Sequence, residues 1–301
     1  MTTSATATGA ARVPAWGLAV TAMLSVQLGS ALSVDLIATV GPAGTAWLRL
    51  TMGALIFLTI TRPPLRQVRR ADLPALVGLG VATGLVTIGF LAAIERIPLG
   101  TAVAIEFLGP LTVAAIRSPT RRALAWPALA LAGVVLLTEP WHGTVNPAGL
   151  GFAAFAAVGW ATYILLTQHI GDRFTGITGL SLTVPIAAAT AAISGIPQAA
   201  GHLTPSILAA ALGLALLLPV LPFALEMLAL RRMTHTGFGT LMSLEPAFGL
   251  LLGLIVLHQT PSAIQLVGIA TVVCAGAAAQ RHGQRTPPAA DTIHSELDLI
   301  G

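Results

Sequence analysis

The chain has 301 residues, 55% of them hydrophobic and only 9% charged, and its formal net charge is +4. Soluble domains carry about 25% charged residues, so this composition excludes a water-soluble protein. All 15 basic residues are arginines, mostly in short segments between apolar stretches, and they form no basic face that would indicate nucleic-acid binding.

Apolar stretches long enough to cross a bilayer, about 17–25 residues each, recur along the whole chain. We predict ten transmembrane helices and therefore an all-α integral membrane protein. The helices are predicted at residues 14–35, 41–60, 73–94, 98–117, 122–138, 148–168, 177–195, 206–229, 236–257 and 261–280. The first is too long for the apolar core of a signal peptide and many spans follow it, so we expect it to be retained.

The arginines divide very unevenly between the two sets of loops. If the N-terminus is cytoplasmic, 13 arginines lie in cytoplasmic segments, Arg96 lies in an outer loop, and Arg49 lies within a helix. Positively charged loops stay in the cytoplasm, so both termini are predicted to be cytoplasmic. They form an N-terminal tail of residues 1–13 and a Pro-rich tail of residues 281–301, which we expect to be disordered.

An internal repeat is indicated by two similar segments, residues 90–110 and 225–246. Each contains an apolar helix, a short turn with an arginine, and a second apolar helix interrupted by glutamate and proline. Pro110 and Pro246 occupy matching positions, and Pro222 is a further predicted helix break.

The halves of the chain, residues 14–138 and 148–280, each contain five predicted helices. Five is an odd number, so the second half would insert upside down relative to the first. Inverted repeats of this kind surround a central substrate site in secondary transporters.

Arg49 lies about nine residues inside the second predicted helix, roughly 12 Å from its start at 1.5 Å per residue. A charged side chain at this depth is costly unless it is paired or faces water. One interpretation is a cation that binds a substrate carboxylate, because guanidinium matches carboxylate in bidentate geometry. The other is a structural ion pair with a glutamate inside the membrane.

Two glutamates accompany the predicted helix breaks. Glu106 lies four residues before Pro110, which cannot donate a hydrogen bond to the carbonyl of residue 106. A carboxylate beside a free carbonyl suits a substrate ammonium or a proton, although Glu106 could instead bond a neighbouring hydroxyl. Glu245 directly precedes Pro246, and its alternative role is to pair with Arg49.

Three further residues are candidate ligands. Glu226 shares a helix face with Pro222, or else extends to the inner interface beside Arg231. Gln27 lies deep in the first helix, where a ligand contact is plausible. Tyr163 belongs to a row of residues at helical spacing on the sixth helix, a pattern that packing also explains.

No pattern typical of an enzyme or of nucleotide-driven transport occurs in the sequence. We find no Ser-His-Asp or His-Glu-x-x-His pattern, no metal-ligand spacing among the seven histidines, and no Walker loop. We therefore predict no catalytic residues, no metal and no cofactor.

Four segments resemble the EamA-type drug/metabolite transporter superfamily, and within it bacterial threonine/homoserine exporters. They are residues 41–50, 97–111, 221–233 and 241–249, and the resemblance extends over roughly residues 14–280. It implies ten helices in two inverted five-helix repeats, and export of small metabolites in exchange for protons. One departure is the end of the ninth helix, where Leu257-His258-Gln259 replaces the usual acidic end.

The resulting hypothesis is an exporter of small, threonine- or homoserine-like amino acids in the bacterial cytoplasmic membrane. Arg49 would bind the substrate carboxylate, and Glu106 with Glu245 or Glu226 would bind the ammonium or the exchanged proton. The expected partners are the amino acid, protons and the lipid bilayer, with a homodimer as one option for assembly. Alternatives are an exporter of other metabolites or drugs, an intramembrane enzyme, and a membrane scaffold that does not transport.

Overall fold

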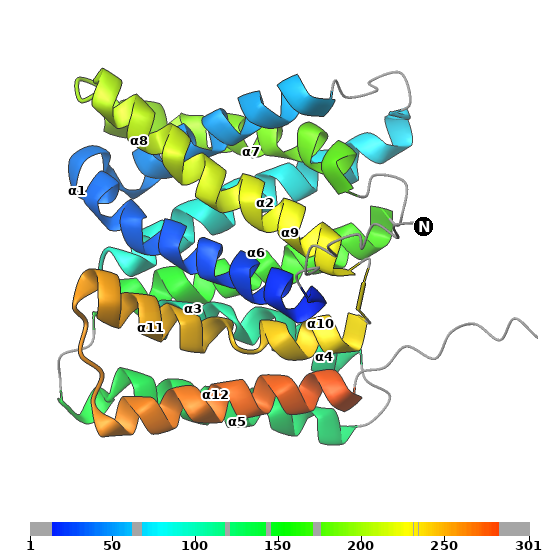
Figure 1. Cartoon of the computed structure of the whole chain (residues 1–301), viewed down its shortest axis with the longest axis vertical. Coiled ribbons are helices and arrows are strands. Elements are labelled where there is room, and N and C mark those ends of the chain that lie inside the picture. The colour runs from blue at the N-terminus through cyan, green and yellow to red at the C-terminus, as the bar shows by residue number, and fades with distance from the viewer. Residues whose placement is uncertain are drawn as a thin grey trace, which may run out of the picture.

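The computed structural model describes residues 14–61, 68–117, 121–142, 146–170, 176–230, 232–233 and 235–282. Every regular element in this part is helical, and the helices lie side by side with their axes roughly aligned (Figure 1). Eight helices among the described residues are long and apolar enough to cross a membrane. The first helix begins and the last helix ends on the same side of the bundle (Figure 1).

The first helix, α1 (Ala15–Thr61), consists of two helices that meet at Gly41. Gly41 has φ 70° and ψ 169°, a conformation that glycine adopts readily because it lacks a Cβ atom. The chain doubles back at this point (Figure 1). The prediction of a loop over residues 36–40 is therefore wrong. Burial of Leu36, Ile37 and Val40 against neighbouring helices keeps this stretch helical up to the turn residue.

The remaining elements follow the predicted order, with bounds within about one turn of those expected. They are η2 (Arg70–Asp72), α2 (Leu73–Ile94), α3 (Leu99–Glu106), α4 (Leu108–Ile116), η3 (Arg121–Leu124), α5 (Ala125–Thr138), η4 (Pro140–His142), α6 (Pro147–Ile170), α7 (Gly176–Ala199), α8 (Pro205–Ala215), η6 (Leu216–Val220), α9 (Leu221–Leu230), α10 (His235–Met242), α11 (Glu245–Leu257) and α12 (Ala263–His282).

Two apolar stretches are interrupted in the middle. Phe107 separates α3 from α4, and Ser243 and Leu244 separate α10 from α11. Proline explains both interruptions, because Pro110 and Pro246 lack the N–H that would continue the helical ladder. A third stretch is interrupted within η6, where Leu218 has a non-helical φ of −160° and ψ of 110°. The predicted break at Pro222 is therefore wrong, because Pro222 lies in the first turn of α9, where a proline needs no N–H donor.

α1 lies at the centre of the arrangement. It contacts α2, α7, α8, α9, α10 and α11, and so joins the first part of the chain to the second. Side chains from both parts form the main apolar core, including Leu91, Leu99 and Val272. Large apolar side chains such as Ile116 and Ile193 are exposed on the outside, as expected for a bundle surrounded by lipid.

Candidate functional site

Four charged side chains within the bundle interact with one another, and we call them the charged cluster: Arg49, Glu106, Glu226 and Glu245. Arg49 interacts electrostatically with Glu106, and Glu245 interacts with both Glu106 and Glu226. Residues from α1, α3, α9 and α11 therefore lie close together, although they are up to 196 positions apart in the sequence. Arg49 and Glu245 are only 4% and 5% exposed.

Arg49 has little direct compensation for its buried charge. Its Nη1 atom donates a long hydrogen bond of 3.4 Å to the hydroxyl of Ser33, on the other half of α1. No carboxylate of the described residues lies within ion-pair distance of its guanidinium. A buried charge without a close partner costs several kcal/mol, so an added carboxylate would stabilise this site.

Glu106 is the last residue of α3, directly before the interruption at Phe107. Its carboxylate receives no hydrogen bond from the side chains that the structure describes, so the alternative role of bonding a neighbouring hydroxyl finds no support there. The carbonyl of Glu106 faces Pro110 one turn later, which cannot donate to it. Glu106 thus combines a carboxylate with a carbonyl that lacks its usual helical donor at residue 110.

Glu245 occupies the other side of an interruption, as the first residue of α11. A negative charge is favourable there because the helix N-terminus carries a partial positive charge. Its interactions are with the like charges of Glu106 and Glu226, and not with a nearby arginine. Carboxylates that interact in this way repel one another, and a bound cation or proton would reduce that repulsion.

Glu226 and Tyr163 lie at the margin of the charged cluster. Both side chains are partly buried, Glu226 on α9 and Tyr163 on α6. Tyr163 interacts electrostatically with Glu226, which in turn interacts with Glu245. A series of pairwise interactions therefore links five of the predicted binding residues: Arg49, Glu106, Glu245, Glu226 and Tyr163.

Gln27 lies on the first half of α1 and is only 2% exposed. Its Oε1 atom has no hydrogen-bond partner among the described residues. A Cβ atom placed on Gly249 of α11 would lie 3.4 Å from that oxygen, so Gln27 faces α11 one turn beyond Glu245.

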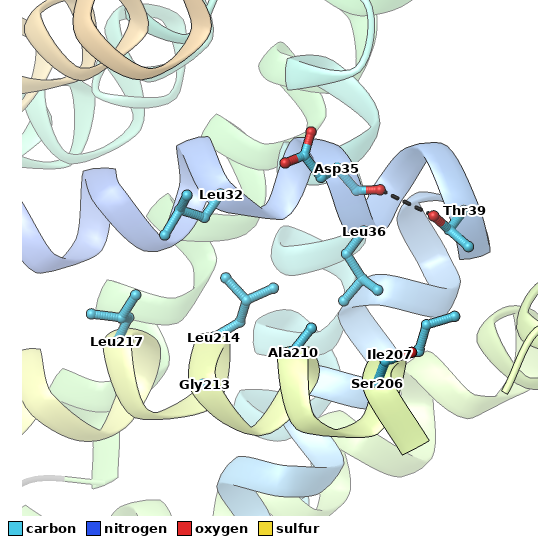
Figure 2. A pocket seen from close by; sticks show the side chains of 10 residues that line it. All are labelled: Leu32, Asp35, Leu36, Thr39, Ser206, Ile207, Ala210, Gly213, Leu214 and Leu217. Carbon is cyan, nitrogen blue, oxygen red and sulfur yellow. Dashed lines mark hydrogen bonds between the residues drawn. The ribbon is translucent and has the colours of Figure 1, made fainter. Parts of the chain in front are cut away.

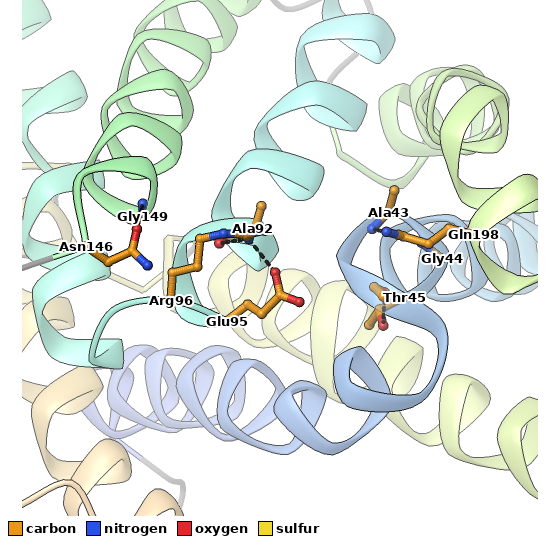
Figure 3. Close-up of polar contacts among 10 residues, drawn as sticks. Ala43, Gly44, Thr45, Ala92, Glu95, Arg96, Asn146, Gly149 and Gln198 are labelled. Atoms are coloured by element: carbon orange, nitrogen blue, oxygen red, sulfur yellow. Dashed lines mark hydrogen bonds and ion pairs between the residues drawn. The ribbon is translucent and has the colours of Figure 1, made fainter.

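Sequence reasoning did not identify Ser33 or Gln198 as supports of the site. The Gln198 Oε1 atom, near the end of α7, accepts hydrogen bonds from the backbone N–H groups of Ala43 and Gly44 at 2.7 and 3.0 Å (Figure 3). These N–H groups begin the second half of α1, so Gln198 fixes the start of the helix that carries Arg49. The sequence offers one signal for Ser33: Ser33 and Arg49 are each eight residues from Gly41, on opposite sides of it.

A cavity of about 470 Å³ lies between α1 and α8. Figure 2 shows the side chains that line it. Leucines from both helices point into it, including Leu32, Leu36 and Leu214. Thr39 and Ser206 lie toward one end of the cavity, and Asp35 lies near its middle (Figure 2). No member of the charged cluster lines this cavity. Its apolar lining does not suit a charged solute.

Arg96, the arginine predicted in an outer loop, also lies outside the charged cluster. It pairs with Glu95 and donates to the carbonyl of Ala92 at 2.7 Å (Figure 3). Its guanidinium carbon lies 5.1 Å from the ring centre of Phe152, so it joins the end of α2 to α6.

Known proteins resemble this chain over most of its length. The EamA-like transporter family matches residues 147–278. Threonine/homoserine exporter RhtA of Escherichia coli (strain K12) is 35% identical over 277 residues, which cover 88% of this chain and 91% of that protein. The exporter of the same name from Salmonella typhimurium (strain LT2) is 36% identical over 262 residues, covering 84% and 87%. A solved structure at 18% identity, described as "Crystal structure of protein", superposes with a TM-score of 0.59 over 88% of this chain and 98% of its own, which shows a shared fold.

Proposed function

The chain belongs to the EamA-like transporter family, and from that premise we propose that it exports threonine, homoserine or similar small amino acids in exchange for protons. Membership makes the chain a multi-pass membrane transporter and not an enzyme. The substrate class is inferred from the relatives named as threonine/homoserine exporters. The charged cluster is the observation in this chain that supports it best.

A zwitterionic amino acid complements the charged cluster. Its carboxylate would bind the Arg49 guanidinium, which lacks a carboxylate at ion-pair distance among the described residues. Its ammonium would bind between Glu106 and Glu245, which repel each other when the site is empty. One ligand would thus relieve both the unpaired cation and the crowded carboxylates.

Exchange follows if the ammonium and the proton compete for the same carboxylates. In this scheme the protein switches between its inward-facing and outward-facing states only when the site holds an amino acid or a proton. An empty site does not switch. Glu106 and Glu245 are the proposed proton carriers, with Glu226 next to them. An inward proton gradient would then drive the amino acid outward.

The proposed architecture is two inverted five-helix repeats, residues 14–138 and 148–280. Counting the halves of α1 separately and adding the shorter apolar helix α12 brings the eight candidate spans to ten. A family match confined to residues 147–278 is consistent with a second half that is a unit of its own. Rocking one repeat against the other would expose the charged cluster to each side in turn.

Both termini are proposed to be cytoplasmic. The arginine distribution supports this orientation, because loops rich in arginine remain in the cytoplasm. The start of α1 and the end of α12 lie on one side of the bundle, as the proposal requires (Figure 1).

Efflux from vesicles tests the proposal directly. Purified protein is reconstituted into liposomes loaded with radiolabelled threonine, homoserine, phenylalanine or glucose. We expect threonine and homoserine to leave faster when the outside is acidic than at equal pH, and a protonophore to remove the difference. Efflux of threonine and homoserine no faster than from protein-free liposomes would refute the substrate class, and efflux indifferent to the gradient would refute proton exchange.

A further inference from the structure

Gln27 is a buried polar side chain without a hydrogen-bond partner among the described residues. It does not belong to the charged cluster, so the roles proposed for that cluster do not explain it. The Gln27 side chain is 2% exposed, and its Oε1 atom has no partner in the described part of the chain. Buried polar groups are nearly always hydrogen-bonded, because an unpaired acceptor costs the full penalty of leaving water. A buried amide without a partner therefore points to a partner that arrives with a ligand.

The residues of α3 and α11 that the structure places near the Oε1 atom of Gln27 have no side-chain donor. Its Oε1 atom faces Gly249 of α11, where a Cβ atom would lie 3.4 Å away. The same point lies 3.0 Å from a methyl carbon of Val103 on α3. A glycine and a valine cannot donate from a side chain, so these two neighbours leave the acceptor unsatisfied.

The two neighbours of Gln27 each lie about one helical turn from a glutamate of the charged cluster. Val103 precedes Glu106 by three residues and Gly249 follows Glu245 by four, which corresponds to roughly 4.5 and 6 Å along the helix axes. A ligand whose ammonium sits between Glu106 and Glu245 would therefore have Gln27 about one turn away along these helices. A small hydroxy amino acid can span this separation, with its ammonium hydrogen-bonded to the glutamates and its side-chain hydroxyl hydrogen-bonded to Gln27.

We infer that Gln27 is the residue that recognises the side-chain hydroxyl of the substrate, and so selects hydroxy amino acids over apolar ones of the same size. The inference rests on the proposed function and adds to it the group that distinguishes substrates. Threonine and homoserine share a hydroxyl, whereas valine and norvaline carry a methyl group in its place. A methyl group would leave the Gln27 acceptor buried and unpaired, and sites built around a substrate hydroxyl reject such analogues strongly.

Competition measurements in vesicles test this role. Unlabelled threonine, valine, homoserine and norvaline compete with labelled threonine for transport by the parent protein and by Gln27→Leu. We expect the parent to prefer threonine over valine and homoserine over norvaline by roughly fivefold or more, the net value of one neutral hydrogen bond. Gln27→Leu is expected to lower both ratios to near one. Gln27→Glu keeps an acceptor and is expected to keep the preference.

Ser30→Ala provides the matched control, because Ser30 lies one turn away on α1 and its hydroxyl already donates to the carbonyl of Val26 at 2.9 Å. It should leave both ratios unchanged. If Gln27→Leu does not transport, stabilisation of the purified variant against heat by threonine and by valine replaces the competition assay.

The outcomes separate the inference from the proposed function. A parent that transports threonine and homoserine but does not prefer them over valine and norvaline overturns the role of Gln27 and leaves the function standing. A Gln27→Leu variant that retains the full preference does the same. A parent that neither binds nor transports hydroxy amino acids overturns both.

Discussion

The hydroxyl oxygen of Ser33 lies 3.4 Å from Nη1 of Arg49, and these residues are equally distant in sequence from the turn at Gly41. Ser33 is eight residues before Gly41 and Arg49 is eight residues after it. Because α1 doubles back at Gly41, equal spacing brings the two side chains to the same level. The single turn residue thus determines which side chain of the first half meets the buried guanidinium.

Replacing Ser33 by alanine is expected to release the guanidinium of Arg49 without unfolding the protein. The hydrogen bond is long, so the loss of stability should be about 0.5–1 kcal/mol. The apparent KM for threonine should rise several-fold, because Arg49 would no longer be held in place. Efflux kinetics and a thermal melt of the purified variant measure the two effects. A KM equal to that of the parent would show that Arg49 needs no support from Ser33.

Arg49→Ala is expected to abolish threonine transport while leaving thermal stability equal or higher. The unoccupied site contains a buried charge without a close ionic partner among the described residues, and removing such a charge removes its desolvation cost. Arg49→Lys keeps the charge but cannot form a bidentate contact, so transport should fall at least about tenfold. Parent-like transport by the alanine variant would contradict the proposed role of Arg49.

Glu106→Gln should remove proton-driven efflux of threonine. The amide has nearly the same shape but cannot exchange a proton or attract an ammonium as a carboxylate does. Glu95→Gln is the matched control, because Glu95 lies at the exposed end of α2 and pairs with Arg96. The measurement is efflux with and without an inward proton gradient. If gradient-driven efflux persists in Glu106→Gln, another carboxylate must carry the proton.

Gln198→Leu is expected to destabilise the fold more than Gln259→Leu. Gln198 accepts two backbone hydrogen bonds at the start of the second half of α1, whereas Gln259 accepts one, from the N–H of Leu99 at 3.0 Å. Each lost bond to a helix start costs about 1 kcal/mol. Thermal melts in detergent compare the variants. Equal melting temperatures for Gln198→Leu and the parent would exclude a role for this contact in stability.

Gly109→Ala tests the close packing beside the interruption of the α3–α4 stretch. A Cβ atom at Gly109 would lie 2.2 Å from the carbonyl oxygen of Ala157 on α6, so the two helices would have to separate. Such overpacking typically costs about 1–3 kcal/mol. Gly151→Ala is the control, since a Cβ atom there meets nothing within 4 Å. Loss of melting temperature in the first variant only is the expected result.

The sequence identifies the charged side chains of the site more readily than their supports. Arg49, Glu106 and Glu245 are conspicuous because a charge inside an apolar helix is costly and therefore rare. Ser33 and Gln198 are neutral and resemble many other polar residues in helices. The partner of Gln198 is 154–155 residues away, so only the packing of α7 against α1 reveals its role.

The sequence offset between Glu106 and Glu245 also has a physical explanation that the sequence alone did not provide. Glu106 ends the helix before one interruption, whereas Glu245 begins the helix after the other. The two carboxylates approach the charged cluster from opposite sides of their respective breaks. Matching prolines therefore do not require matching glutamates.

The turn at Gly41 has a consequence for how substrate preference can change over time. On the proposed roles, Gln27, Ser33 and Arg49 all belong to the single hairpin formed by α1, whereas the proton-carrying glutamates are distributed over α3, α9 and α11. The contacts to the carboxylate and the side chain of the cargo are then inherited as one uninterrupted stretch of sequence, while the glutamates bind the ammonium that all amino acids share. A short exchange or a few mutations within residues 27–49 could give a descendant a new cargo while the energy-coupling residues stay as they were.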